Sequence, residues 1–204
     1  LARPTFNYTR PRDGEPFYYL GVARRRLGKT QEAEDAFERA AWSPAWRAVS
    51  FHELAEMAST GGDFAKALDF LERALGADAR TLNTLNLKAA VLRRLGMTED
   101  AASVVTAVRR ADPLDFWSLH ELYLLQVSEG DAASARESFA ALDALLDGSV
   151  PNLLELTMDY ANCGFWKEAA AVLGPRVLEG RLAANPLPAY AFAYVLDKTG
   201  QKEN

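Results

Sequence analysis

The chain has 204 residues, of which 49% are hydrophobic and 25% are charged, and its net charge is −5 at neutral pH. This mildly acidic composition offers no basic stripe to a nucleic acid. No apolar run approaches the roughly 18 residues that a membrane-spanning helix needs. The one cysteine, Cys163, excludes an internal disulfide. We therefore expect a folded protein with no nucleic-acid partner and no membrane insertion.

Two residue types recur along the chain at an unbroken spacing of 34, which indicates a repeat of two helices per unit. The glycines of this series are Gly28, Gly62, Gly96, Gly130 and Gly164, and Gly200 follows after 36 residues. The alanines are Ala33, Ala67, Ala101, Ala135 and Ala169. Glycine is expected to end the first helix of each unit, where a left-handed residue costs least. Alanine is expected to let the second helix approach the first closely, because a larger side chain would overpack the contact.

The 34-residue spacing predicts the following elements along the chain. Residues 1–13, which include Pro4 and Pro11, are expected to form an extended linker. The predicted solenoid, 14–204, contains five complete repeats at 14–47, 48–81, 82–115, 116–149 and 150–187. A half repeat at 188–204 supplies one further helix from about Pro188 to Lys198. The expected caps of second helices are Thr30, Asp63, Thr98 and Asp131.

Large apolar residues occupy fixed positions in these repeats when the first repeat begins at Gly14. The fourth positions are Phe17, Phe51, Leu85, Leu119 and Leu153, and the twenty-fourth are Phe37, Leu71, Val105, Phe139 and Leu173. With the repeated alanine at position twenty, this pattern resembles the tetratricopeptide-repeat (TPR) family. The resemblance implies an all-α fold, a right-handed superhelical solenoid of antiparallel helix pairs, with five full repeats plus one helix.

Several positions depart from the family pattern. Lys88 stands at the usually apolar seventh position, where we expect Leu87 to turn inward instead. Tyr123 and Thr157 replace the small eighth residue, so the fourth and fifth repeats are expected to splay. Arg176 stands at the twenty-seventh position, which is otherwise small, and is expected to weaken the fifth repeat.

The TPR resemblance also implies a ligand groove lined by the first helix of each repeat (helix A), mainly at positions two, five, nine and twelve. On this chain the groove is expected to be polar in its N-terminal two-thirds and apolar towards Leu154 and Met158. The candidate groove residues are Tyr18, Arg25, His52, Glu56, Asn83, Asn86, Arg93, Trp117 and His120. Trp117 is the favoured anchor, since exposed tryptophans dominate interface energies.

These residues are not expected to form a metal site, a carboxylate-binding clamp or a catalytic site. His52 and His120 lie in different repeats, too far apart to share an ion, and His52 with Glu56 supplies only two ligands, short of a zinc set. The carboxylate clamp of one TPR subclass needs paired cations, which the corresponding positions of this chain lack. No nucleophile motif or phosphate loop stands out. We expect no metal, no cofactor and no enzyme activity in this chain.

The leading hypothesis is a protein-interaction scaffold whose concave helix-A face binds a peptide or a neighbouring domain of its own chain. The chain starts at Leu1 rather than Met, so we expect it to be part of a longer protein, and we expect that protein to be cytoplasmic. The final helix, with Tyr190 and Tyr194, is expected to lack cover on one side and to allow self-association.

Residues 153–173, and the run Pro188-Ala189-Tyr190 before the helix that ends at Gly200, are similar to a second group of proteins. These are large bacterial proteins with TPR repeats in the C-terminal half and an N-terminal half that resembles carbohydrate-processing domains. This second resemblance implies an alternative function, in which the chain is the non-catalytic helical half of such a protein and serves as a scaffold or oligomer contact.

Overall fold

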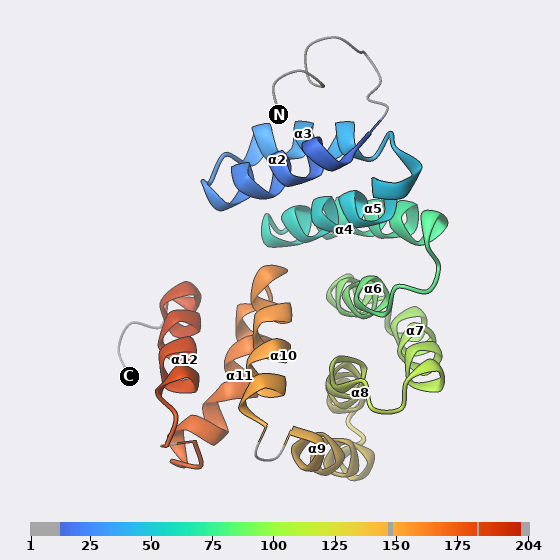
Figure 1. The fold of residues 1–204 in the computed structure, drawn as a ribbon. Helices are drawn as coiled ribbons and strands as arrows, with labels where there is room; N and C mark the ends of the chain where they lie inside the picture. Colours follow the sequence, from blue (N-terminus) through green and yellow to red (C-terminus); the bar gives the residue numbers. More distant parts are fainter. Residues whose placement is uncertain (1–12, 147–148, 183, 201–204) are drawn as a thin grey trace. The chain divides into compact units, whose positions relative to one another are not determined.

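A computed structural model describes residues 13–146, 149–182 and 184–200 of the chain. Over these residues the protein is all-α, with eleven helices and no strand (Figure 1). It divides into two compact units, Leu1–Val104 and Val105–Asn204. The expected linker falls almost entirely on residues 1–12, outside the described residues, as does the end of the half repeat at 201–204.

The helices form consecutive pairs joined by short turns. The first unit holds α2 (Glu15–Arg26), α3 (Thr30–Ala40), α4 (Pro44–Thr60), α5 (Phe64–Ala77) and α6 (Leu82–Arg94). The boundary between the units falls within α7 (Thr98–Ala111). The second unit continues with α8 (Phe116–Glu129), α9 (Ala132–Leu146), α10 (Val150–Asn162), α11 (Trp166–Leu178) and α12 (Pro186–Thr199). The even-numbered helices are therefore the predicted helices A, and the odd-numbered ones are the second helices of the repeats (helices B).

The repeated glycines and alanines have the roles that the sequence predicts. All six glycines of the series adopt positive φ, between 71° and 80°. A Cβ built on Gly62 would meet no atom within 4 Å, so its left-handed backbone, and not lack of space, is what favours glycine there. The five alanines are 0–5% exposed, as expected for the close approach of helix B to helix A.

Two of the four predicted caps are correct and two are wrong. Asp63 accepts a hydrogen bond from the amide of Lys66, and Asp131 accepts one from the amide of Ser134. Thr30 and Thr98 are instead the first residues of α3 and α7. The cap position follows the glycine directly, and each threonine comes one residue later, already inside the helix.

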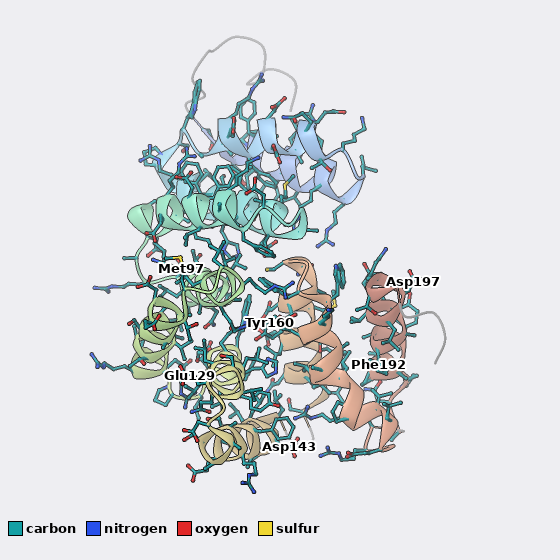
Figure 2. The ribbon with its side chains drawn as sticks, turned by 180° about the vertical axis from the view of Figure 1, so that it is seen from behind. Met97, Glu129, Asp143, Tyr160, Phe192 and Asp197 are labelled. Atoms are coloured by element: carbon teal, nitrogen blue, oxygen red, sulfur yellow. The ribbon has the colours of Figure 1, made fainter. Side chains whose placement is uncertain are left out.

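The unusual residues of the repeat are accommodated individually. Leu87 is 0% exposed, as predicted, and Lys88 points its ammonium to Glu72, with 2.6 Å between Nζ and Oε1. Arg176 on α11 is 5% exposed and donates to Oδ1 of Asp143 on α9 at 2.6 Å (Asp143 is labelled in Figure 2). The buried guanidinium is therefore paired, which is the condition under which a buried charge is tolerated.

The last helix, α12, is covered on one side only. It begins at Pro186, two residues earlier than expected, and contacts α11 and α10. Tyr190 is 73% exposed and Tyr194 is 42% exposed, although the ring of Tyr194 meets the ring of Trp166 edge-on. Self-association through these exposed rings stays a prediction.

Candidate functional site

The helices A of the first unit bring polar side chains together on one surface. Helix α4 contacts α2 before it and α6 after it, so the three helices A are neighbours in space (Figure 1). Their apolar residues, such as Phe17 on α2 and Leu54 on α4, are buried. Because residues three and four apart share a helix face, Glu53 and His52 fall on the same side of α4 as Glu56, and this side bridges α2 and α6.

Two glutamates of α4 meet the basic and phenolic groups of α2. Nη1 of Arg25 donates to Oε2 of Glu53 at 2.6 Å and to Oε2 of Glu56 at 2.5 Å. The hydroxyl of Tyr18 donates to Oε1 of Glu53 at 3.1 Å. One guanidinium thus holds two carboxylates that would otherwise repel each other.

The chain of polar contacts continues from α4 to α6. Nε2 of His52 lies 3.3 Å from Oε1 of Glu56, and its Nδ1 lies 3.1 Å from Oγ1 of Thr84. An ionised carboxylate only accepts hydrogen bonds, so Nε2 carries a proton. In the neutral ring Nδ1 then accepts from the hydroxyl of Thr84. These residues form one connected set, the α2–α4–α6 network, whose members are Tyr18, Arg25, His52, Glu53, Glu56 and Thr84.

The surroundings shift the pKa values of three members of the network. Burial acts to raise the pKa of Glu56, but hydrogen bonds and charge from His52 and Arg25 outweigh it and hold that pKa below its ordinary value of 4.5. Burial acts to lower the pKa of Arg25, and the carboxylates of Glu56 and Glu53 raise it on balance. Burial and the nearby Glu53 both raise the pKa of Tyr18, so its phenol stays a hydrogen-bond donor at neutral pH.

The network is held in place and still reaches solvent. The side chains of Arg25, Glu53, Glu56 and His52 keep between 15% and 24% of their surface exposed. Two carboxylates, Glu53 and Glu56, face the one guanidinium of Arg25. Within the described part of the chain, no group of three His, Cys, Asp or Glu side chains is placed to hold a metal ion. The arrangement is suited to accept hydrogen bonds, and a positive charge, from a ligand.

The structure brings together four of the nine predicted groove residues, Tyr18, Arg25, His52 and Glu56. On α6, Asn83 is exposed and Arg93 is half-buried. Asn86 on the same helix is only 1% exposed, so the expectation that it lines an accessible groove is wrong. Sequence reasoning also left Glu53 and Thr84 out of the site, because they stand at positions six and three of their repeats. A signal for Glu53 was present, since it lies three residues before Glu56 on a helix that faces a cation.

Trp117 and His120 are not accessible ligand contacts, contrary to the prediction. They are 3% and 2% exposed, and both pack on Tyr160 of α10, which is labelled in Figure 2. The hydroxyl of Tyr160 donates to Oε1 of buried Glu121 at 2.8 Å. A hydroxyl has one proton to donate, so Nδ1 of His120, 2.9 Å away, donates to the Tyr160 oxygen. Tyr160, the large side chain at position eleven of the fifth repeat, therefore covers Trp117, the predicted anchor.

No protein-family model matches the chain, but solved structures share its fold. A tetratricopeptide repeat protein from Parabacteroides merdae superimposes with a TM-score of 0.61 at 18% identity, over 92% of this chain and 74% of that one. YrrB, described as a TPR protein with an unusual peptide-binding site, gives 0.58 at 16% identity, over 80% and 84%. The thermophilic TPR protein TTC0263 from Thermus thermophilus gives 0.58 at 21% identity, over 90% and 98%.

The helix pairs, their period and these likenesses define the class: the chain is a helical-repeat protein. Its repeat is of the tetratricopeptide type, and it has the TPR fold. Within residues 13–146, 149–182 and 184–200, no helix is both long and apolar enough to cross a membrane.

Proposed function

We propose that the protein is an interaction module and that the α2–α4–α6 network binds an extended segment of polypeptide, from a partner or from a neighbouring domain of the same chain. The observation behind this proposal is the pair of carboxylates, Glu53 and Glu56, fixed by Arg25 on a face that reaches solvent. Because these side chains are already held in place, little conformational entropy is lost when a ligand binds. The peptide-binding site named for YrrB is consistent with this use of the fold.

The charge of the network selects among polypeptide segments. Because two carboxylates share one guanidinium, the network favours a lysine or arginine side chain over an acidic one. A partly exposed ion pair contributes only about 0.2–1 kcal/mol. The charge therefore sets preference and association rate, and the remaining contacts along helices A supply most of the affinity.

The proposal can be tested by selecting phage-displayed random peptides on the whole chain and measuring the best of them by fluorescence anisotropy. We expect peptides enriched in lysine and arginine, with binding that weakens as salt is added. Glu53→Gln keeps the shape of the side chain and removes its charge, so we expect about two- to fivefold weaker binding.

The matched control is Glu38→Gln, at an exposed glutamate of α3 on helix B of the first repeat. It removes the same charge from the same unit and should leave binding unchanged. Circular dichroism would confirm that both variants are folded. Equal weakening by both variants, or no enrichment of peptides over a bare surface, would argue against a ligand face on α2, α4 and α6.

A further inference from the structure

The second unit contains a hollow of about 500 Å³ on the α8–α9 helix pair. It is lined by Tyr123, Val127, Gly130, Ala132, Ala135, Arg136 and Phe139. Its volume lies within the range of about 300–1,000 Å³ that is usual for small-ligand pockets. None of its lining residues belongs to the α2–α4–α6 network, so the hollow is a separate feature of the molecule.

The hollow occurs where the eighth residue of the repeat is large. In the three preceding helices A this residue is Gly21, Ala55 or Ala89, and all three are buried. A Cβ on Gly21 would stand 2.7 Å from the ring of Phe37, which shows that the helix-B ring lies directly against helix A in that repeat. Helix α8 has Tyr123 at this position instead.

Tyr123 prevents the equivalent helix-B ring from closing on helix A. Its ring centroid lies 5.3 Å from that of Phe139, with 52° between the ring planes. Phe139 is half-buried, whereas its counterpart Phe37 is 0% exposed. Val127, one turn beyond Tyr123, is 51% exposed. The result is a wall of two aromatic rings and several aliphatic groups that is open to solvent.

One cation, Arg136, stands in this apolar wall. Its Nε donates to the carbonyl oxygen of Ala132 at 3.2 Å, which holds the side chain along the start of α9. Within the described part of the chain, no carboxylate pairs with it. The nearby carboxylate of Asp131 accepts instead from the amide of Ser134. The terminal guanidinium nitrogens of Arg136 are thus available to a ligand anion.

We propose that this hollow binds an aromatic side chain of a polypeptide ligand that has a carboxylate in an adjacent residue. The ligand ring would pack on Tyr123 and Phe139, since aromatic pairs gain from offset or edge-on contact. The adjacent carboxylate would pair with Arg136, whose planar fork suits a carboxylate. The ligand therefore differs from that of the α2–α4–α6 network, which favours a cation.

The test uses the whole chain and three defined probes. The first is an acetylated and amidated Ser-Glu-Phe-Ser peptide, the second replaces its glutamate by glutamine, and the third is N-acetyl-phenylalanine. Binding is followed by two-dimensional NMR, with assigned resonances of Tyr123, Ala135 and Phe139 as reporters. We expect the first peptide to shift these resonances, and the glutamine peptide to bind about two- to fivefold more weakly.

Two pairs of variants separate the apolar and the ionic contributions. Ala132→Leu places a larger side chain in the hollow and should weaken the first peptide about tenfold or more. Ala133→Leu, at the exposed neighbouring residue that does not line the hollow, should not. Arg136→Gln should abolish the difference between the glutamate and glutamine peptides, and Arg110→Gln, at an exposed arginine of α7, should preserve it.

Three outcomes would overturn the proposal. The peptide could leave the reporter resonances unshifted, or Ala132→Leu and Ala133→Leu could weaken it equally. N-acetyl-phenylalanine could also bind as tightly as the peptide, which would assign the hollow to small molecules and not to a polypeptide.

Discussion

The two units are built from the same type of repeat, but their helices A present different surfaces. In the first unit, polar side chains connect α2 to α4 through Arg25 and Glu53, and α4 to α6 through His52 and Thr84. In the second unit, the helix-A residues Trp117 and His120 are buried around Tyr160. Position eleven of the repeat is Ala58 in the second repeat and Tyr160 in the fifth. One large side chain at a contact between helices can therefore decide whether the neighbouring residues are accessible to a ligand.

The eighth position of the repeat shows the same effect on the helix-B side. Gly21 allows Phe37 to pack fully against α2, whereas Tyr123 leaves Phe139 half-buried beside a hollow. Replacing equivalent residues in the two units therefore tests whether the second unit is the more loosely packed one.

The largest expected effect comes from removing the ring at position twenty-four. Phe37→Ala should lower the free energy of unfolding by about 3–5 kcal/mol, as for a fully buried phenylalanine. Phe139→Ala should cost about half as much or less, because that ring is already half-buried at the edge of a hollow. Urea unfolding followed by far-ultraviolet circular dichroism gives both values. Equal losses would mean that the fourth repeat is packed as tightly as the first.

A smaller effect is expected at position eight of the first repeat. Gly21→Ala places a methyl group about where three ring atoms of Phe37 lie within 2.9 Å, so overpacking should cost about 1–3 kcal/mol. For a chain of this size, the melting temperature should fall by about 2–4 °C per kcal/mol. Gly76→Ala on α5 is the control, since its Cβ would meet no atom within 4 Å. The better helix propensity of alanine should raise stability there, and a rise at Gly21 as well would refute the tight contact.

The smallest effect is the acid sensitivity that Glu56 gives to the first unit. Folding lowers the pKa of Glu56, so the native state binds fewer protons than the unfolded state. The corresponding stability is complete well above pH 4.5 and is lost as the pH falls through the lower folded-state pKa. Urea midpoints between pH 7 and pH 3.5 should therefore fall less steeply in Glu56→Gln than in the wild type. Glu38→Gln should retain the wild-type slope, and identical slopes in all three proteins would show that Glu56 is not linked to folding.

Features that depend on local geometry and on the repeat could be predicted from the amino-acid sequence. The left-handed glycines, the buried alanines and the helix pairs all follow from a period of 34, because each repeat meets nearly the same neighbours as the last. The inward turn of Leu87 beside Lys88 could be predicted for the same reason. For such contacts, the position of a residue in its repeat is enough to predict which neighbours it has.

The accessibility of individual side chains could not be predicted in this way, because it depends on contacts between helices of different repeats. The burial of Trp117, His120 and Glu121 depends on Tyr160, about forty residues later, whose ring and hydroxyl reach back to α8. Glu53 belongs to the α2–α4–α6 network because Arg25 of the preceding repeat donates a hydrogen bond to it. Such contacts join non-equivalent positions of different repeats, and their reach is set by the size and charge of individual side chains. Periodicity specifies where helices lie, but it does not specify these pairwise contacts across helices.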